Sequence, residues 1–235
     1  LAYFTGSKEH NIVMRQRAID RGLRLSEFGL IPEAEAGDLK GMAAAHLSLP
    51  AVDEAEIYRH LELDWVPPEL REDTGEISAA GEDTLPRLIV PTDVKGALHN
   101  HTTLSDGDAT LEQMADAARN IGWNWLGIAD HSPTLKVANG ASAEDLLAQG
   151  RQIKQYNEAW SNDGVDFRLF HGVESDILDG GKLDHPDTVL GELDYVVASV
   201  HAMTKWKNRD EVTNTEELIR CIDHPATTVL GLSLI

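Results

Sequence analysis

The sequence predicts an α/β fold in which helices cover a parallel sheet, preceded by a smaller, mainly helical part. Apolar runs typical of strands lie at residues 94–98, 123–129, 167–173, 195–200 and 227–232. Helical patterns separate them, at residues 111–121, 143–160, 186–190 and 215–222. Repeated strand and helix predict a parallel sheet, either open or closed into a barrel.

A change of composition separates this pattern from the start of the chain. Residues 67–86 place Asp, Thr, Gly and Glu between prolines and predict a linker, where we place the domain boundary. Before it we expect a helix over residues 8–21, capped by Ser7 and ended by Gly22, and a second helix over residues 52–61. The first part is therefore expected to be a small domain of its own.

Composition excludes several classes of protein. The 235 residues are 42% hydrophobic and 26% charged, as in a soluble globular chain with one large or two small domains. No run reaches the roughly 18 apolar residues of a membrane span, and the first ten residues do not resemble a signal peptide. The single cysteine, Cys221, excludes an internal disulfide or a cysteine metal cluster. We therefore expect a cytoplasmic protein without a membrane partner, and the chain reads as a piece of something longer.

The net charge of −20 lies in the second part of the chain. Residues 1–50 carry six basic and six acidic side chains, whereas residues 51–235 carry 14 basic and 34 acidic ones. This excess argues against non-specific nucleic-acid binding by the second part, because phosphate contact needs a basic surface. The excess of acidic side chains is compatible with a site in which carboxylates and histidines bind cations, and the bound cations then bind an anionic substrate.

Side chains that bind metals follow four successive predicted strands. They are His99 and His101 with Asp106, then Asp130 and His131, then Glu174 and Asp176, then His201. In a βα barrel the carboxyl ends of the strands build the site together. Histidine and carboxylate ligands without thiolate fit Zn, Mn or Fe, and the number of ligands predicts more than one ion. Other histidines, His10, His46, His60 and His185, are interpreted as residues without partners.

The motifs around these residues resemble a known family. HNHTTLSDG, IADHS, GVESDI and SVHAM are similar in order and spacing to the PHP (polymerase and histidinol phosphatase) domain. YFTGSKEHNIVMR and EIYRHLELDWVPPELRE resemble the thumb subdomain of family X DNA polymerases. The resemblance implies a small α+β thumb at 1–72, a linker at 73–94 and, at 95–235, a distorted (β/α)7-type PHP barrel that is incomplete at its C-terminus.

The resemblance also implies roles for residues. The metal ligands would be His99, His101, Asp106, His131, Glu174 and His201, which would hold two to three Mn or Zn ions and hydrolyse DNA from its 3′ end. No catalytic residue beyond these ligands is assigned. In the thumb, Tyr3, Phe4 and Gly6 would form the turn against the sugar of the incoming deoxynucleotide, with Ser7 after it. Asn11 would reach the nascent base pair and Arg15 the template strand. Without the resemblance, Asn11 and Arg15 equally fit a solvated helix face. DNA is the implied partner, Mg the ion of the polymerase part, and a monomer the expected state.

The sequence departs from the family pattern in two places. The palm with its catalytic aspartates would precede Leu1, so we expect no polymerisation by this chain. A family ligand would follow Gly231, where Leu232 stands, and later ligands would lie beyond Ile235. Six of nine expected ligands are therefore present, and the third metal position is open.

Three functions remain at this stage. The first is part of a DNA repair polymerase whose PHP domain is a 3′–5′ exonuclease. The second is a PHP phosphatase of a small phosphate ester, against which the thumb motif argues. The third is an inert PHP module that supports the polymerase. A metal content near zero would favour the inert module, and two or more ions would favour hydrolysis.

Overall fold

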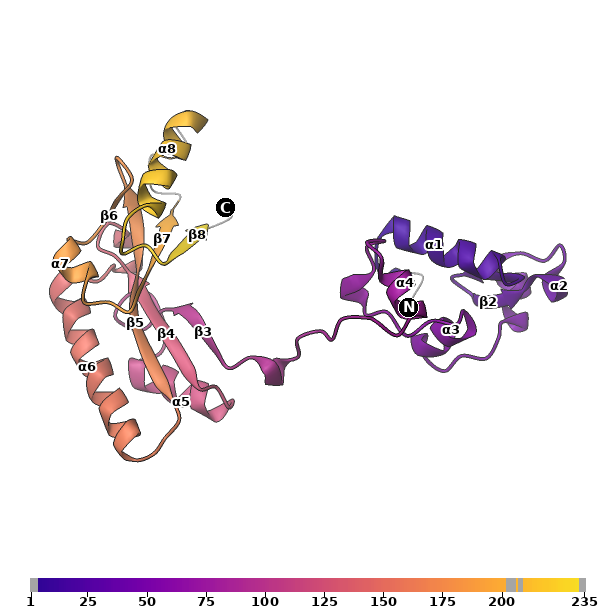
Figure 1. Ribbon diagram of the computed structural model, residues 1–235, viewed down its shortest axis with the longest axis horizontal. Helices are drawn as coiled ribbons and strands as arrows, with labels where there is room; N and C mark the ends of the chain where they lie inside the picture. Colours follow the sequence, from indigo (N-terminus) through magenta and orange to yellow (C-terminus); the bar gives the residue numbers. More distant parts are fainter. Residues whose placement is uncertain (1–3, 202–205, 207–208, 233–235) are drawn as a thin grey trace. The chain divides into compact units, whose positions relative to one another are not determined.

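A computed structural model describes residues 4–201, 206 and 209–232. The chain divides into two compact units, Leu1–Leu88 and Ile89–Ile235, which are described separately (Figure 1). None of the helices within the described residues has the length and apolar composition that a membrane crossing requires.

The first unit joins short helices to one hairpin. Its helices are α1 (Lys8–Ile19), α2 (Glu33–Ala36), α3 (Glu54–His60) and α4 (Glu76–Gly81), with 3₁₀ turns η2 (Gly41–Leu47) and η3 (Pro68–Leu70). The antiparallel hairpin pairs β1 (Leu23–Ser26) with β2 (Gly29–Pro32). The two helices that the sequence predicts here are confirmed as α1 and α3. Ser7 caps α1, because its side-chain oxygen accepts a hydrogen bond from the backbone N–H of His10.

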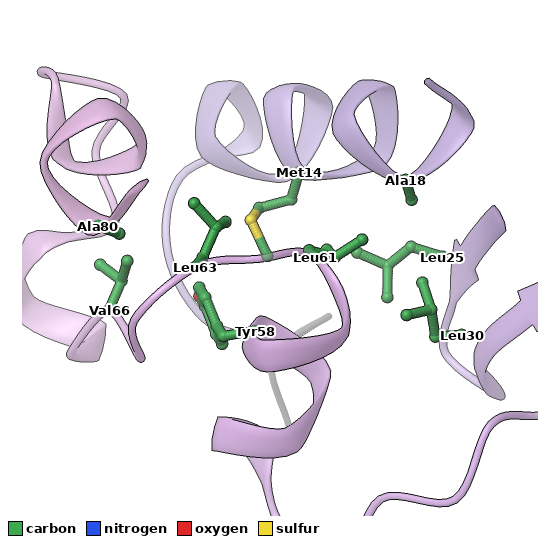
Figure 2. Packing of buried hydrophobic residues seen from close by; sticks show 9 residues of the cluster. All are labelled: Met14, Ala18, Leu25, Leu30, Tyr58, Leu61, Leu63, Val66 and Ala80. Carbon is green, nitrogen blue, oxygen red and sulfur yellow. The ribbon is translucent and has the colours of Figure 1, made fainter. Parts of the chain in front are cut away.

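The core of this unit lies beneath α1 (Figure 2). Met14 and Ala18 of α1 pack with the hairpin and with Tyr58 and Leu61 at the end of α3. Tyr58 and Leu61 are completely buried. This packing holds α1 in place.

The stretch expected to be a linker is partly folded. Within it, α4 contributes Ala80 to the core, and the buried carboxylate of Glu76 bonds to His10. The two units divide after Leu88, later than the stretch 67–86 and within the linker at 73–94 that the resemblance implies. Ile77 and Ala80, three residues apart, form a short apolar helix face that the surrounding Gly, Thr and Glu conceal in the sequence.

The second unit confirms the predicted parallel α/β sheet. Its strands run in the order β3 (Gly96–Asn100), β4 (Trp125–His131), β5 (Arg168–Leu178), β7 (Tyr195–Val200) and β8 (Val229–Leu232), all parallel. A short strand, β6 (Lys182–Leu183), pairs antiparallel with β5. The connections carry α5 (Leu111–Asn120), α6 (Ala143–Asn162), α7 (Asp187–Leu190) and α8 (Glu211–Ile222), and the turns η4 (Pro91–Asp93) and η5 (Lys136–Ala138). The sheet curls into half of a barrel.

The register of this sheet brings the strand ends together. His131 at the end of β4 pairs with Glu174 on β5, and Asp176 further along β5 pairs with Ser199 on β7. The strands on either side of β5 are buried: Ile128 of β4 and Val197 of β7, for example, have no exposed surface. Because the strands are parallel, their carboxyl ends lie next to one another along one edge of the sheet.

Candidate metal centre

The structure brings all six predicted ligands together at this edge. Their nitrogen and carboxylate oxygen atoms form three overlapping groups, and the atoms of each group lie within 4.8 Å of one another. The groups are His99, His101 and Glu174; His101, Asp106 and His131; and His131, Glu174 and His201. Side chains that lie up to 102 positions apart in the sequence thus meet in one cluster.

His99 and His101 reach the cluster through an irregularity in β3. The register with β4 shifts between Ala97 and Asn100, and His99 has a left-handed backbone with φ of 64°. The Asn100 amide donates hydrogen bonds to the carbonyls of Ala97 and Gly127, at 3.2 and 2.9 Å. The two imidazoles meet with ring centroids 5.2 Å apart. A bulge of this kind re-aims side chains next to functional sites, and regular strand alternation does not describe it.

Glu174 lies at the centre of the cluster. Its Oε2 is 2.9 Å from His131 Nδ1, 3.1 Å from His99 Nε2 and 3.4 Å from His101 Nε2, and its Oε1 is 3.3 Å from His201 Nε2. Burial alone would raise the pKa of this carboxyl, but its interactions with the surrounding histidines hold the pKa well below its usual range. Glu174 is therefore a buried carboxylate that stays ionised.

The donor atoms fit divalent cations. The buried Nδ1 atoms of His101 and His131 have no hydrogen-bond partner in the part of the chain that the structure describes. His131 Nδ1 is close to Glu174, but not in hydrogen-bond geometry. Burial, together with the neighbouring His131, lowers the pKa of His101 and favours its neutral form. Neutral imidazoles and ionised carboxylates that face one another are the state that metal binding requires.

Asp106 closes the cluster from the loop after β3. Its two carboxylate oxygens lie 3.4 Å from His101 Nδ1 and 3.5 Å from His131 Nε2. Its side chain is about half exposed. An exposed oxygen ligand beside buried nitrogens leaves one side of the cluster open to a substrate.

Asp176 supports the cluster through His201, although it is outside the predicted ligand set. It is 1% exposed, and its Oδ1 lies 2.9 Å from Nδ1 of His201. The bonds to Asp176 and Glu174 raise the pKa of His201 to about 9. A carboxylate that holds the second ring nitrogen fixes the orientation of a ligating histidine. The sequence indicates that Asp176 lies near the ligands, because it follows Glu174 by two positions, the spacing that puts both side chains on one face of a strand.

Asp130 organises the loop that carries Asp106 and belongs to none of the three groups. Its Oδ1 accepts bonds from Thr102 N–H and Ser105 Oγ, at 2.7 and 2.6 Å. Its Oδ2 accepts bonds from Thr102 Oγ1 and Gln149 Nε2, at 2.8 and 2.6 Å. Asp130 has no exposed surface. The three bonds from Thr102 and Ser105 anchor the turn just before Asp106, and the fourth ties Asp130 to Gln149 of α6.

Of the residues assigned to nucleotide and DNA binding, Phe4, Gly6 and Ser7 lie just before α1, and Asn11 and Arg15 lie within it. Tyr3 is outside the described residues. Phe4 is 75% exposed. Gly6 has φ of +83°, and a Cβ there would lie 2.4 Å from Cβ of Arg71, so the turn requires glycine. Ser7 follows it as the helix cap.

Asn11 and Arg15 make local hydrogen bonds in the first unit. The Asn11 amide donates to the carbonyls of Thr5 and Ser7, at 3.3 and 3.0 Å, and Arg15 Nε donates to the carbonyl of Asn11 at 3.1 Å. Both side chains are half-buried. Their roles toward DNA stay predictions.

Two of the histidines that we interpreted as partnerless have partners. His10 is buried, with Nδ1 2.6 Å from Oε1 of Glu76 and Nε2 3.2 Å from the hydroxyl of Tyr58. His60 Nε2 lies 3.1 Å from the carbonyl of Pro50. The interpretation was wrong because these partners come from distant segments that no local pattern connects.

Fold and site together define a parallel α/β half-barrel with a histidine and carboxylate cluster at its carboxyl edge. Residues 97–227 match the PHP domain model, more than half of the chain, and residues 1–72 match the DNA polymerase beta thumb. The chain therefore belongs to the PHP domain family, and the resemblance to a family X polymerase with thumb and PHP domain is confirmed.

One curated relative matches the chain across both parts, and others match a little more than half of it. Over 236 residues the chain is 39% identical to the DNA polymerase/3'-5' exonuclease PolX of Bacillus subtilis (strain 168), an alignment that covers 98% of this chain and 39% of that protein. A probable phosphatase of Clostridium botulinum (strain Hall) is 34% identical over 137 residues, 57% of this chain and 51% of the relative. A probable phosphatase of Thermoanaerobacter sp. (strain X514) is 30% identical over 142 residues, which cover 59% of this chain and 54% of the relative. The chain thus spans about half, or less, of the length of these relatives.

Proposed function

We propose that the chain is part of a family X DNA repair polymerase and that its second unit hydrolyses DNA phosphodiester bonds from the 3′ end. The observation that carries the proposal is the convergence of four histidines on the buried carboxylate of Glu174. A thumb of the DNA polymerase beta type in the same chain favours DNA as the substrate. The name of the Bacillus subtilis relative also combines a DNA polymerase with a 3'-5' exonuclease.

The cluster would hold two to three divalent ions, with manganese or zinc as the expected metals. Glu174 belongs to two of the three ligand groups, and its two oxygens can serve both. Bound divalent ions lower the pKa of water and neutralise the charge of phosphate oxygens. The chain's own residues prepare this site: Asp176 orients His201, and Asp130 anchors the loop of Asp106.

The acidic charge of the chain makes bound cations necessary for this function. With a net charge of −20, the surface repels a nucleic-acid backbone. Positive ions at the cluster reverse the local sign and give the phosphate a place to bind. Without bound cations, the acidic surface would repel the phosphates of a DNA strand from this edge of the sheet.

For the first unit we propose binding of DNA and a deoxynucleotide by the turn before α1. Gly6 holds this turn against Arg71, and the ring of Phe4, which is mostly exposed, would pack against a sugar. Asn11 and Arg15 follow along the helix, at the spacing of one face. The polymerase reaction, with Mg as its ion, would need the palm domain of the family. We further propose that the whole protein is monomeric and cytoplasmic.

Manganese-dependent shortening of a 5′-labelled single strand tests the exonuclease. We expect stepwise shortening from the 3′ end, abolished by His101→Ala and unaffected by His46→Ala, which removes an exposed histidine from the first unit. The metal content of each variant is measured alongside. A folded chain that contains manganese and releases nothing would contradict the proposal.

A phosphatase of small phosphate esters is the second candidate, because the Clostridium and Thermoanaerobacter relatives are named probable phosphatases. The same preparation is given p-nitrophenyl phosphate and the DNA strand in parallel. Release from the monoester alone would favour a phosphatase. Neither release nor bound metal would favour an inert module.

A further inference from the structure

A cavity adjoins the candidate metal centre at the same edge of the sheet. It has a volume of about 640 Å³, in the range of small-molecule sites. Asp176 lines it and also bonds to His201, so one side chain separates the cavity from the ligands. A larger cavity, of about 1410 Å³, lies by Asn124 and Arg168 at the amino ends of β4 and β5 and contains none of the six candidate ligands.

Continuations of three ligand-bearing strands build the wall of this cavity. Leu135 and Val137 lie in the turn that follows His131 at the end of β4. Leu178 is the last residue of β5, four positions beyond Glu174. The described residue Trp206 comes five positions after His201. A substrate held at the ligands would therefore extend into this cavity.

The lining suits a flat ring with polar edges. Leu135, Val137 and Leu178 supply apolar surface, and the half-buried indole of Trp206 is held by its N–H, which donates to the carbonyl of Ile177 at 3.4 Å. Oδ2 of Asp176 is buried and accepts no hydrogen bond from any described residue. A buried acceptor of this kind calls for an N–H or O–H donor on a ligand.

Two lysines at the rim add positive charge to an otherwise acidic unit. Lys136 and Lys182 are exposed, line the cavity, and form no ion pair within residues 4–201, 206 and 209–232. The remaining charged residue of the lining, Asp179, is neutralised by Arg209. The rim thus favours an anionic ligand with an apolar ring, which describes a nucleotide.

We propose that this cavity binds the base and sugar of the 3′-terminal nucleotide, the one that is removed. Trp206 and Leu135 contact the base, Asp176 accepts a hydrogen bond from the nucleoside, and Lys136 and Lys182 lie near phosphate oxygens. The inference rests on the proposed exonuclease and gives it a substrate subsite. It predicts that the terminal base contributes to hydrolysis.

The test compares two 5′-labelled single strands that differ only at the 3′ end, one ending in a normal thymidine nucleotide and the other in an abasic one. The whole chain is loaded with Mn²⁺, and Val137→Asp is compared with Val212→Asp, the same change at an exposed valine of α8. Val137→Asp should lower kcat/KM for the normal strand about tenfold, the order of losing one stacked base. It should lower kcat/KM for the abasic strand much less, because that strand lacks the base and keeps only the phosphate contacts, and Val212→Asp should change neither.

Direct binding separates this inference from the activity it rests on. Equilibrium dialysis measures the affinity of the Mn²⁺-loaded chain for dTMP, which Val137→Asp should weaken about tenfold and Val212→Asp should leave unaltered. Trp206→Ala, checked for folding by its unfolding midpoint, should behave like Val137→Asp. Equal effects on both strands, or dTMP affinity indifferent to Val137, would overturn the cavity as a nucleotide site. If neither strand is hydrolysed by the parent but dTMP binds as predicted, the exonuclease fails and the cavity stands.

Discussion

Replacement of Asp176 by Asn tests whether this buried carboxylate prepares the metal centre. The Asp176 carboxylate bonds to Nδ1 of His201 at 2.9 Å and leaves Nε2 of that ring directed at Glu174. Asn has the same size but no charge, and its amide can donate to Nδ1 instead. Donation would move the ring proton to Nε2 and remove the lone pair that a metal ion needs.

The size of the effect follows from the bond that is lost. A hydrogen bond to a charged group contributes about 1.5–3 kcal/mol, and every 1.4 kcal/mol is about tenfold in affinity. Loss of a carboxylate behind a metal-ligating histidine costs about 10- to 100-fold in metal affinity or activity. We therefore expect Asp176→Asn to weaken Mn²⁺ binding about 10- to 100-fold.

Titration of the metal-free chain with Mn²⁺, followed by calorimetry, measures this change. Asp116→Asn, which removes an exposed carboxylate from α5, is the matched control and should bind Mn²⁺ like the parent. A folded Asp176→Asn variant with unchanged affinity would refute the role assigned to Asp176.

Three further predictions concern charge and stability. Glu174→Gln removes a carboxylate shared by two ligand groups, and we expect metal analysis to find at least one bound ion fewer per chain. Without metal, the bonds to Asp176 and Glu174 raise the pKa of His201 to about 9, so the stability from its protonated form is complete below pH of about 6.5 and is lost as the pH rises through 9. Urea midpoints of the second unit should therefore fall between pH 7 and 9.5, and a pH-independent midpoint would contradict this. Glu76→Gln breaks the buried pair with His10 and should destabilise the first unit by about 3–5 kcal/mol in urea unfolding, leaving the second unit unchanged.

Strand periodicity predicts the parallel sheet and the gathering of candidate ligands at its strand ends for one physical reason, and the family resemblance selects the six ligands among them. Parallel strands end at a common edge, so residues such as His131 and Glu174, each at or near a strand end, become neighbours without knowledge of the packing. The apolar runs locate the strands, and the side chains that follow them locate the cluster.

Other parts of the site depend on contacts that no local pattern contains. The bulge at His99 interrupts the regular alternation by which residues two positions apart on a strand share a face. Asp130 serves the loop from Thr102 because the fold brings Gln149 and that loop to it. The role of Asp176 also needs the position of His201 on a different strand.

The folded part of the expected linker escaped prediction for a similar reason. The helix α4 has six residues, too few to show a helical period, and it is held by Ala80 in the core and by bonds from Glu76. His10 accordingly looked partnerless, since its partner lies 66 positions away. Short elements held by tertiary contacts are the least visible in a sequence.

The central claim is that this edge of the sheet is a metal centre with several ions. Metal analysis of the chain, after saturation with Mn²⁺ and removal of free ions, tests it most directly, with a chain carrying His101→Ala and His131→Ala beside it. Two to three ions per chain, reduced in the double variant, are predicted. Less than one ion per folded chain, or a content that the two substitutions leave unchanged, would contradict the account.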